Sequence, residues 1–160
     1  MTSANTEYLI VEAQPEHVAE LIDNLRPVDH DEILAMGIPA DQAEKTVWHT
    51  YRMSTVAWAG LADGRVVAVF GVTPLSYLLG HGSPWMLGTT LLDAHTVRFA
   101  RESRPVVERM QRAYPRLTNY IDYRNKKTIR WLKWLGFDIK PAEPYGLIGH
   151  PFHKFTYGED

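Results

Sequence analysis

Residues 117–137, LTNYIDYRNKKTIRWLKWLGF, constrain the fold of this chain more than any other stretch. The run from Leu117 to Tyr123 predicts a short strand, and Asn125 is a residue type that often caps a helix with its side-chain oxygen. Apolar residues then recur at helical spacing, at Ile129, Leu132 and Leu135. Gly136 supplies the positive φ that ends a helix, and Phe137 returns the chain to the core. The stretch therefore predicts a strand, a helix and a second strand in immediate succession.

The rest of the chain alternates between strand and helix patterns in a similar way. Asp63-Gly64 is a strong hairpin signal between two predicted strands. The predicted strands are Tyr8–Glu12, Thr55–Ala62, Arg65–Val72, Trp85–Leu91, Leu117–Tyr123 and two that start at Phe137 and Phe152. The predicted helices start at Pro15, Asp29, Asp41, Asp93 and Asn125. With no linker or repeat, residues 1–160 are expected to form a single α/β (α+β) domain.

The composition excludes several classes of function. The chain has no cysteine, which excludes disulfides, a thiol nucleophile and cysteine-ligated zinc. Its formal net charge of −2 disfavours nucleic acid as a partner, because such partners call for a strongly basic face. No apolar run approaches the roughly 20 residues that span a bilayer, and the first residues lack the pattern of a signal peptide. We therefore expect a cytoplasmic protein with no membrane partner.

The segment from Asn125 to Phe137 resembles the last unit of the GCN5-related N-acetyltransferase (GNAT) fold, which usually reads Asn-x-x-Ala-x-x-Leu-Tyr-x-x-x-Gly-Phe. The predicted order of elements matches that fold across nearly the whole chain. The resemblance implies a mixed, centrally splayed sheet of six or seven strands flanked by helices, with acetyl-CoA or CoA in the slot at the splay. Leu132 stands where the family usually has its general-acid tyrosine. The stretch from Thr89 to Leu135 contains no glycine, although the family places its glycine-rich phosphate loop there.

Five residues are the candidates for binding the cofactor. Arg98, Arg101, Ser103 and Arg104 could bind phosphate through their side chains, with Ser103 as the cap of a helix that has Pro105 in its first turn. Asn125 is the fifth, at a helix start that is rich in lysine and arginine. The alternative is that both groups of basic residues form the solvated face of an amphipathic helix.

Asp122 is the candidate catalytic residue, as a general base if its side chain faces the splay. It could equally cap the following helix or pair with Arg124. No metal site is expected, because His150 and His153 have no third ligand nearby. The acidic run from Asp29 to Glu32 is explained by the preference for negative charge in the first turn of a helix.

A closer resemblance covers about residues 55–157. Its unusual features are Gly-Val-Thr-Pro-Leu, Gly-Ser-Pro-Trp, Trp-Leu-Lys-Trp-Leu-Gly-Phe and Pro-Phe-His. The stretch is similar to a family of small internal virion or virion-assembly proteins of short-tailed bacteriophages, which carry a degenerate GNAT fold. This implies protein partners among the virion components and a location in the host cytoplasm or the virion interior. The absence of the family's general-acid tyrosine and of its glycine-rich phosphate loop would fit a protein that has lost most or all of its acetyltransferase activity.

Three hypotheses of function remain. A nucleic-acid-binding accessory protein that uses Arg124 to Lys133 is disfavoured by the net charge, and the other two make different structural predictions. The first is a phage assembly protein that acts through protein contacts, and the sequence favours it. It predicts an occluded or unlined cofactor slot and an exposed apolar patch around the helix that carries Trp131 and Trp134. The second is an active acetyl-CoA-dependent N-acetyltransferase. It predicts an open slot into which Asn125 and the arginines point.

Overall fold

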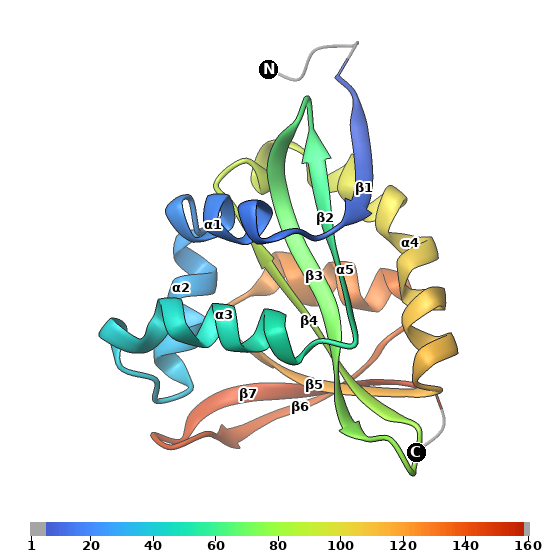
Figure 1. The fold of residues 1–160 in the computed structure, drawn as a ribbon. Helices are drawn as coiled ribbons and strands as arrows, with labels where there is room; N and C mark the ends of the chain where they lie inside the picture. Colours follow the sequence, from blue (N-terminus) through green and yellow to red (C-terminus); the bar gives the residue numbers. More distant parts are fainter. Residues whose placement is uncertain (1–5, 159–160) are drawn as a thin grey trace.

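The computed structural model describes residues 6–158 as one seven-stranded sheet with helices on both faces (Figure 1). The strands are β1 (Tyr8–Glu12), β2 (Val56–Ala62), β3 (Arg65–Ser76), β4 (His81–Gly88), β5 (Arg116–Asp122), β6 (Asp138–Tyr145) and β7 (His150–Tyr157). The helices are α1 (Pro15–Asp23), α2 (Pro27–Ala35), α3 (Ala43–Met53), α4 (Thr96–Ala113) and α5 (Lys126–Leu135), with short 3-10 helices η1 (Ala40–Gln42) and η2 (Leu92–Ala94). No helix in residues 6–158 is long and apolar enough to cross a membrane.

The sheet divides into two parts between β4 and β5. Its strand order is β1-β2-β3-β4-β5-β7-β6, and every neighbouring pair is antiparallel except β4 with β5. That parallel pair is short: only His81↔Arg116 and Gly82↔Leu117 lie in register. Beyond these residues the strands diverge, and β5 to β7 run at a steep angle to β1 to β4 (Figure 1). This confirms the predicted central splay.

Pro84 gives a local reason for the divergence. Alternate residues of β4 turn their backbone N–H and C=O groups toward β5. Pro84 and Gly88 are two of them: Pro84 O accepts from Asn119 of β5, and the N–H of Gly88 donates to Asp29 of α2. A proline has no N–H to donate to a neighbouring strand. The side chain of Asn119 takes the place of the missing backbone partner and donates from Nδ2 to Pro84 O at 2.6 Å. The ladder thus stops where its donor is missing.

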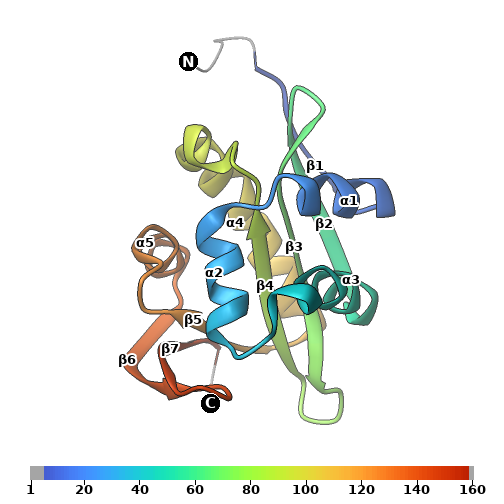
Figure 2. The same cartoon turned by 90° about the vertical axis from the view of Figure 1, so that its left-hand side faces the viewer.

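Two apolar clusters hold the helices on the sheet. One lies between the sheet and helices α4 and α5, and includes Phe99, Val107 and Leu132. The other packs the opposite face of the sheet against α1 and α3, and includes Val18 and Val47. Helix α2 runs alongside β4 over the middle of the sheet (Figure 2). Its position brings α2 next to the splay.

Several predicted boundaries are confirmed. The Asp63-Gly64 turn has positive φ at both residues, +49° and +79°, as a tight hairpin requires. Gly136 has a φ of +103° and ends α5, and the N–H of Phe137 bonds back to Leu132 O. Thus the strand–helix–strand unit has the predicted form.

Other local predictions are wrong. Helix α4 continues without interruption through Pro105, so Ser103 lies inside it and donates to Ala100 O instead of capping a new helix. Asn125 precedes α5, but its side chain makes no cap hydrogen bond. Strand β4 spans His81–Gly88 instead of the predicted Trp85–Leu91. Pro84 is tolerated inside it because the proline nitrogen lies on the side of the strand that has no ladder partner.

Candidate functional site

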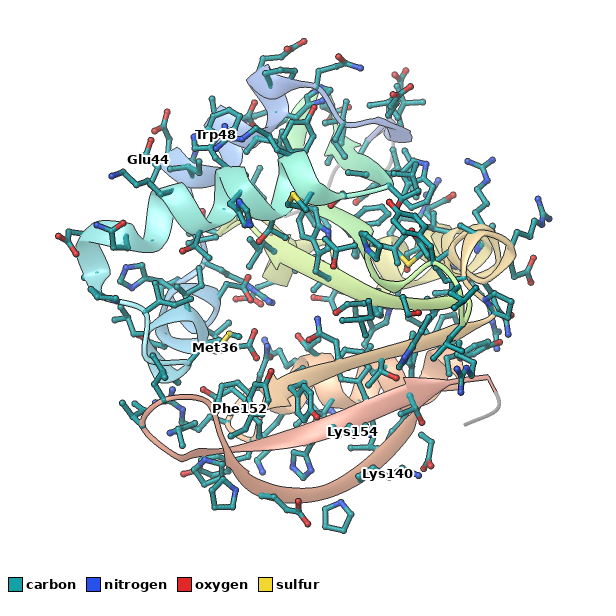
Figure 3. The ribbon with its side chains drawn as sticks, turned by 60° about the horizontal axis from the view of Figure 1, so that its bottom comes forward. Met36, Glu44, Trp48, Lys140, Phe152 and Lys154 are labelled. Atoms are coloured by element: carbon teal, nitrogen blue, oxygen red, sulfur yellow. The ribbon has the colours of Figure 1, made fainter. Side chains whose placement is uncertain are left out.

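A cavity of about 470 Å³ lies at the splay, and we call it the splay cavity. It reaches from α2 and α3 on one face of the sheet, between the diverging strands, to α4 and α5 on the other. Its walls include Glu32 and Met36 of α2, Trp85 and Met86 of β4, and Asn125 and Trp131 beside or on α5. Figure 3 labels Met36 at the end of α2, which lines the cavity, and Phe152 of β7. The volume is within the range of about 300–1,000 Å³ that is usual for small-molecule sites.

Backbone groups of β4 face the splay cavity. Two backbone carbonyls on the side of β4 that faces β5 are hydrogen-bonded. Pro84 O accepts from the side chain of Asn119, and Gly88 O accepts from the N–H of Arg26. Met86 lies between them, and by the same alternation its N–H and C=O point toward β5. The β4–β5 ladder does not include Met86. Its two polar groups therefore form an unpaired strand edge along the wall of the cavity.

Glu32 brings a carboxyl group from α2 to the cavity wall. Its Oε1 accepts the backbone N–H of Asp122 at 2.7 Å, which ties α2 to the end of β5. No residue in the described part of the chain donates to Oε2. Burial, together with the nearby Asp29 and Asp122 carboxylates, raises the pKa of Glu32 to about 8. A carboxyl group with this pKa can exchange a proton near neutral pH.

Asp122 is buried at the end of β5, and its carboxylate is fully engaged. Arg124 donates to it from its guanidinium at 2.6 Å and from its backbone N–H, and His150 Nε2 lies 2.9 Å from Oδ1. Burial acts to raise the pKa of Asp122, but these hydrogen bonds outweigh it and hold the pKa below its usual range. The pairing with Arg124 agrees with the structural alternative. A catalytic role for Asp122 stays a prediction.

Two of the cofactor candidates line the cavity. Asn125 is buried there, and its amide has no hydrogen-bond partner among residues 6–158. Ser103 also lines the cavity, with its hydroxyl used inside α4. Trp131 reaches the same wall and has a buried Nε1–H without a partner in the described chain, a state that costs about 1–3 kcal/mol. Leu132 is buried in the wall at the position that the resemblance gives to a tyrosine.

The three arginine candidates lie on the exposed side of α4, outside the cavity wall. Arg98 pairs with Glu102 at 2.9 Å and covers the ring of Tyr8. Arg104 lies over the ring of Trp134, with its guanidinium carbon 4.5 Å from the ring centre. These contacts agree with the solvated-face alternative. Phosphate binding by Arg98, Arg101 or Arg104 remains a prediction.

The structure adds two acidic residues that the sequence interpretation had explained by the helix dipole. Asp29 is buried, receives two hydrogen bonds from Arg26, and accepts the N–H of Gly88 at 2.8 Å. Glu32 is the second. The signal was available in their spacing: Asp29, Glu32, Ile33 and Met36 share one face of a helix, at i, i+3, i+4 and i+7. Acidic residues on the apolar face of a helix are unusual, and here they mark the site.

His150 and His153 bond to different partners and do not form a shared site. His153 Nδ1 bonds to Lys140 O at 2.7 Å, while His150 contacts Asp122. No group of three or more possible metal ligands occurs within residues 6–158.

Comparison with known proteins adds the fold-level evidence. No family model matches the chain, and no curated protein matches it. Among solved structures, a putative acetyltransferase from Acinetobacter baylyi superposes with a TM-score of 0.74 at 11% identity, covering 98% of this chain and 96% of that one. A GNAT-family acetyltransferase from Streptococcus pneumoniae gives 0.65 at 17% identity, covering 94% and 98%. The chain has the GNAT fold.

A third similar structure bears on the cofactor. It is a ribosomal L7/L12 alpha-N-protein acetyltransferase in complex with coenzyme A, with a TM-score of 0.66 at 10% identity and coverage of 99% and 96%. At such identities the likeness concerns the fold alone. The GNAT resemblance of the sequence is thereby confirmed at the level of the fold, and the resemblance to phage proteins stays a prediction. In this chain the splay cavity lies where the resemblance places the cofactor slot, and cofactor binding there stays a prediction.

Proposed function

We propose that the protein is an N-acyltransferase that binds an acyl-CoA thioester, with acetyl-CoA as the reference donor, in the splay cavity. The observation that carries the proposal is an open cavity at the splay of a GNAT fold, with the carboxyl group of Glu32 on its wall. The second hypothesis predicted this open slot lined by Asn125, although its arginines lie elsewhere. The slot is not occluded, although the assembly hypothesis also allows a slot that is open but not lined by cofactor-binding residues.

The chemistry of the cavity suits the pantetheine arm of such a donor. The arm is an extended chain with two amides, and it can align beside Met86 much as an added strand aligns with a sheet edge. Its amides would satisfy the N–H and C=O of Met86, which have no partner on β5. The apolar side chains of Phe70, Val107 and Leu135 line the rest of the cavity and exclude water from the thioester.

Glu32 is the residue that we assign as general base. An acceptor amine attacks the thioester carbonyl carbon, a C–N bond forms, and Glu32 takes the amine proton. The C–S bond then breaks and the thiolate leaves with the electron pair. A thiol has an ordinary pKa of about 8.5, so the thiolate can leave near neutral pH and take its proton from solvent. Leu132 therefore does not exclude the reaction.

Calorimetry with acetyl-CoA tests binding, and thiol release in the presence of a panel of primary amines tests transfer. We expect wild-type protein to bind acetyl-CoA and to release CoA thiol faster as the pH rises through about 8, the pKa of Glu32. The Glu32→Gln variant should bind acetyl-CoA equally well and lose roughly 10²- to 10⁴-fold in rate, the usual contribution of a general base.

A variant that fills the cavity provides the control. Ser83 lines the cavity on β4, and Ser83→Phe should weaken acetyl-CoA binding more than about tenfold, or 1.4 kcal/mol. Its circular dichroism and melting temperature would show that it still folds. Absence of heat from wild-type protein at high concentration would overturn the proposal. So would thiol release that is the same in Glu32→Gln.

The phage-assembly function is the second candidate, and one observation favours it. The tips of two hairpins expose large apolar side chains: Leu78 is 95% exposed on the β3–β4 tip and Leu147 is 88% exposed on the β6–β7 tip. We propose that, if the chain works in assembly, these tips contact virion components. A phage genome that carries Leu78→Ser with Leu147→Ser would then assemble fewer particles, whereas Glu32→Gln would assemble normally. The opposite pattern would favour the enzyme.

A further inference from the structure

Recognition of the nucleotide part of the donor is a separate question from recognition of its pantetheine arm. From the polar groups next to the splay cavity, we infer that this site binds an acyl-pantetheine thioester through the arm alone and draws no affinity from the phosphates of CoA. This inference rests on the proposed function and specifies its donor class.

The segment between β4 and α4 offers few backbone donors to a phosphate. Anion sites of the backbone type need several N–H groups that point outward together. Here the N–H groups of residues 89, 90, 91, 92, 94 and 95 all bond within the protein, to Val67 O, Asn24 O, Thr89 Oγ1, Thr89 O, Leu91 O and Leu92 O. Leu25 also forms a bridge with Thr89, which closes the segment against the chain before α2. These six donors are therefore used before a ligand arrives. The N–H groups left without an acceptor in the described chain are those of Asp93 and of the first turn of α4, and they follow directly on the Asp93 carboxylate in the sequence.

The charges beside this segment cancel in pairs. Lys127 Nζ lies 3.6 Å from the carboxylate of Asp93, and the buried guanidinium of Arg26 binds Asp29 through two hydrogen bonds. An arriving phosphate would meet Asp93 as well as Lys127, and binding there would require separating that pair. Like charges repel at short range, so Asp93 offsets what Lys127 could contribute.

The basic residues that precede or start α5 have partners of their own. Arg124 is held by Asp122 at 2.6 Å, and the ammonium of Lys126 lies 5.7 Å from the ring centre of Tyr123. On α4, Arg98 and Arg104 are engaged with Glu102 and Trp134. None of these four guanidinium or ammonium groups lines the splay cavity.

Space beside the cavity is also limiting. A hollow lined by Thr96 and Lys127 shares Met86, Thr128 and Trp131 with the splay cavity, so the two lie side by side. Its volume is only about 20 Å³, against about 470 Å³ for the splay cavity. That is room for roughly one water molecule and too little for a phosphate group. The splay cavity therefore has room for the arm, and the adjoining hollow has none for a phosphate group.

The test compares three probes by calorimetry: S-acetyl-pantetheine, acetyl-CoA and adenosine 3′,5′-bisphosphate. We expect the first two to bind with dissociation constants within about threefold of each other, less than 1 kcal/mol apart, and the bisphosphate to show no binding. Raising the salt from about 0.05 to about 0.5 M should leave the affinity for acetyl-CoA unchanged, because no phosphate contact is there to be screened.

Two variants sharpen the comparison. Asp93→Asn removes the competing carboxylate and frees Lys127, so it should tighten acetyl-CoA several-fold and leave S-acetyl-pantetheine unchanged. Glu102→Gln is the matched control, since it neutralises the acidic partner in another exposed ion pair, on the outer side of α4. It should change neither probe.

The possible failures are distinguishable. Acetyl-CoA binding tenfold or more tightly than S-acetyl-pantetheine, or competition by the bisphosphate, would overturn this inference and leave the acyltransferase proposal standing. Failure of both thioesters to bind would overturn the two together.

Discussion

At the scale of single residues, the pH dependence of stability should reveal Glu32. Its pKa rises from 4.5 to about 8 on folding, so the folded state binds a proton more tightly than the unfolded state does. The stability that this gives is complete below pH 4.5 and is lost as the pH rises through about 8. Glu32→Gln cannot ionise, and its amide oxygen can still accept the Asp122 N–H. We expect the variant to match wild type at about pH 5 and to melt about 5 °C higher at about pH 9.

Thermal unfolding followed by circular dichroism at the two pH values makes the measurement. Glu20→Gln is a suitable control, because Glu20 also accepts a backbone N–H, from Val66, at 2.6 Å. A Glu32→Gln variant that melts below wild type at about pH 9 would contradict the raised pKa.

Asp122 should show the opposite dependence. Its pKa is lowered in the folded state, so its contribution is present above pH 3.8 and is lost as the pH falls through the lowered value. Asp122→Asn should reduce the free energy of unfolding by about 2 kcal/mol near pH 7, since it leaves Arg124 without its charged partner. The difference should shrink toward about pH 3.

Urea denaturation across this pH range tests the prediction. Glu102→Gln, in an exposed ion pair, should cost less than about 0.5 kcal/mol and serves as the comparison. A loss in Asp122→Asn that is equally large at about pH 3 would assign its cost to packing or geometry instead of charge.

At the scale of elements, α4 contains a built-in weakness. Pro105 lies inside the helix, where it removes one hydrogen bond and crowds the preceding turn. Because Pro105 is exposed, an alanine there loses no packing, and we expect Pro105→Ala to raise the free energy of unfolding by about 1–3 kcal/mol. Pro15, in the first turn of α1, is the control: Pro15→Ala should bring no gain, since proline is compatible with that position. A Pro105→Ala variant no more stable than wild type would show that the chain is adapted to a bend at this point.

The elements also show what the sequence could and could not predict. The hairpin at Asp63-Gly64 and the helix end at Gly136 follow from φ preferences, which act within a few residues. The N-cap at Asn125 and the helix start at Ser103 failed for the opposite reason. Both residues suit a cap locally, but Asn125 is buried at the cavity wall and Ser103 is held within a longer packed helix. Tertiary contacts overrode local preference in each case.

The site was harder to predict than the fold because it is assembled from distant segments. The Asp122 N–H and the carboxyl group of Glu32 are 90 positions apart in the chain, and only the splay brings them together. The helical spacing that puts Asp29, Glu32 and Met36 on one face can be read from the sequence. The sequence does not indicate that this face packs against the end of β5. Conversely, the resemblance placed the division of the sheet correctly, since the order of elements determines where the sheet divides, and the splay cavity lies at that division.

At the scale of the whole molecule, the two halves of the sheet are joined by a ladder of only two residue pairs, which predicts an unusual pattern of amide exchange. Trp85 and Leu87 face β3 and donate within the β3–β4 pair, whereas Met86 between them faces the splay cavity. In the free protein the Met86 amide should exchange at least about tenfold faster than its two neighbours, although all three lie in the middle of a seven-stranded sheet. S-acetyl-pantetheine should slow Met86 selectively as its amides take the place of the missing strand, while the Asp122 amide, already bonded to Glu32, should change little. Site-resolved exchange by NMR distinguishes the outcomes. A slow Met86 in the free protein would mean that β4 and β5 close over the cavity in solution, and fast exchange that persists with saturating thioester would mean that the donor does not use the strand edge.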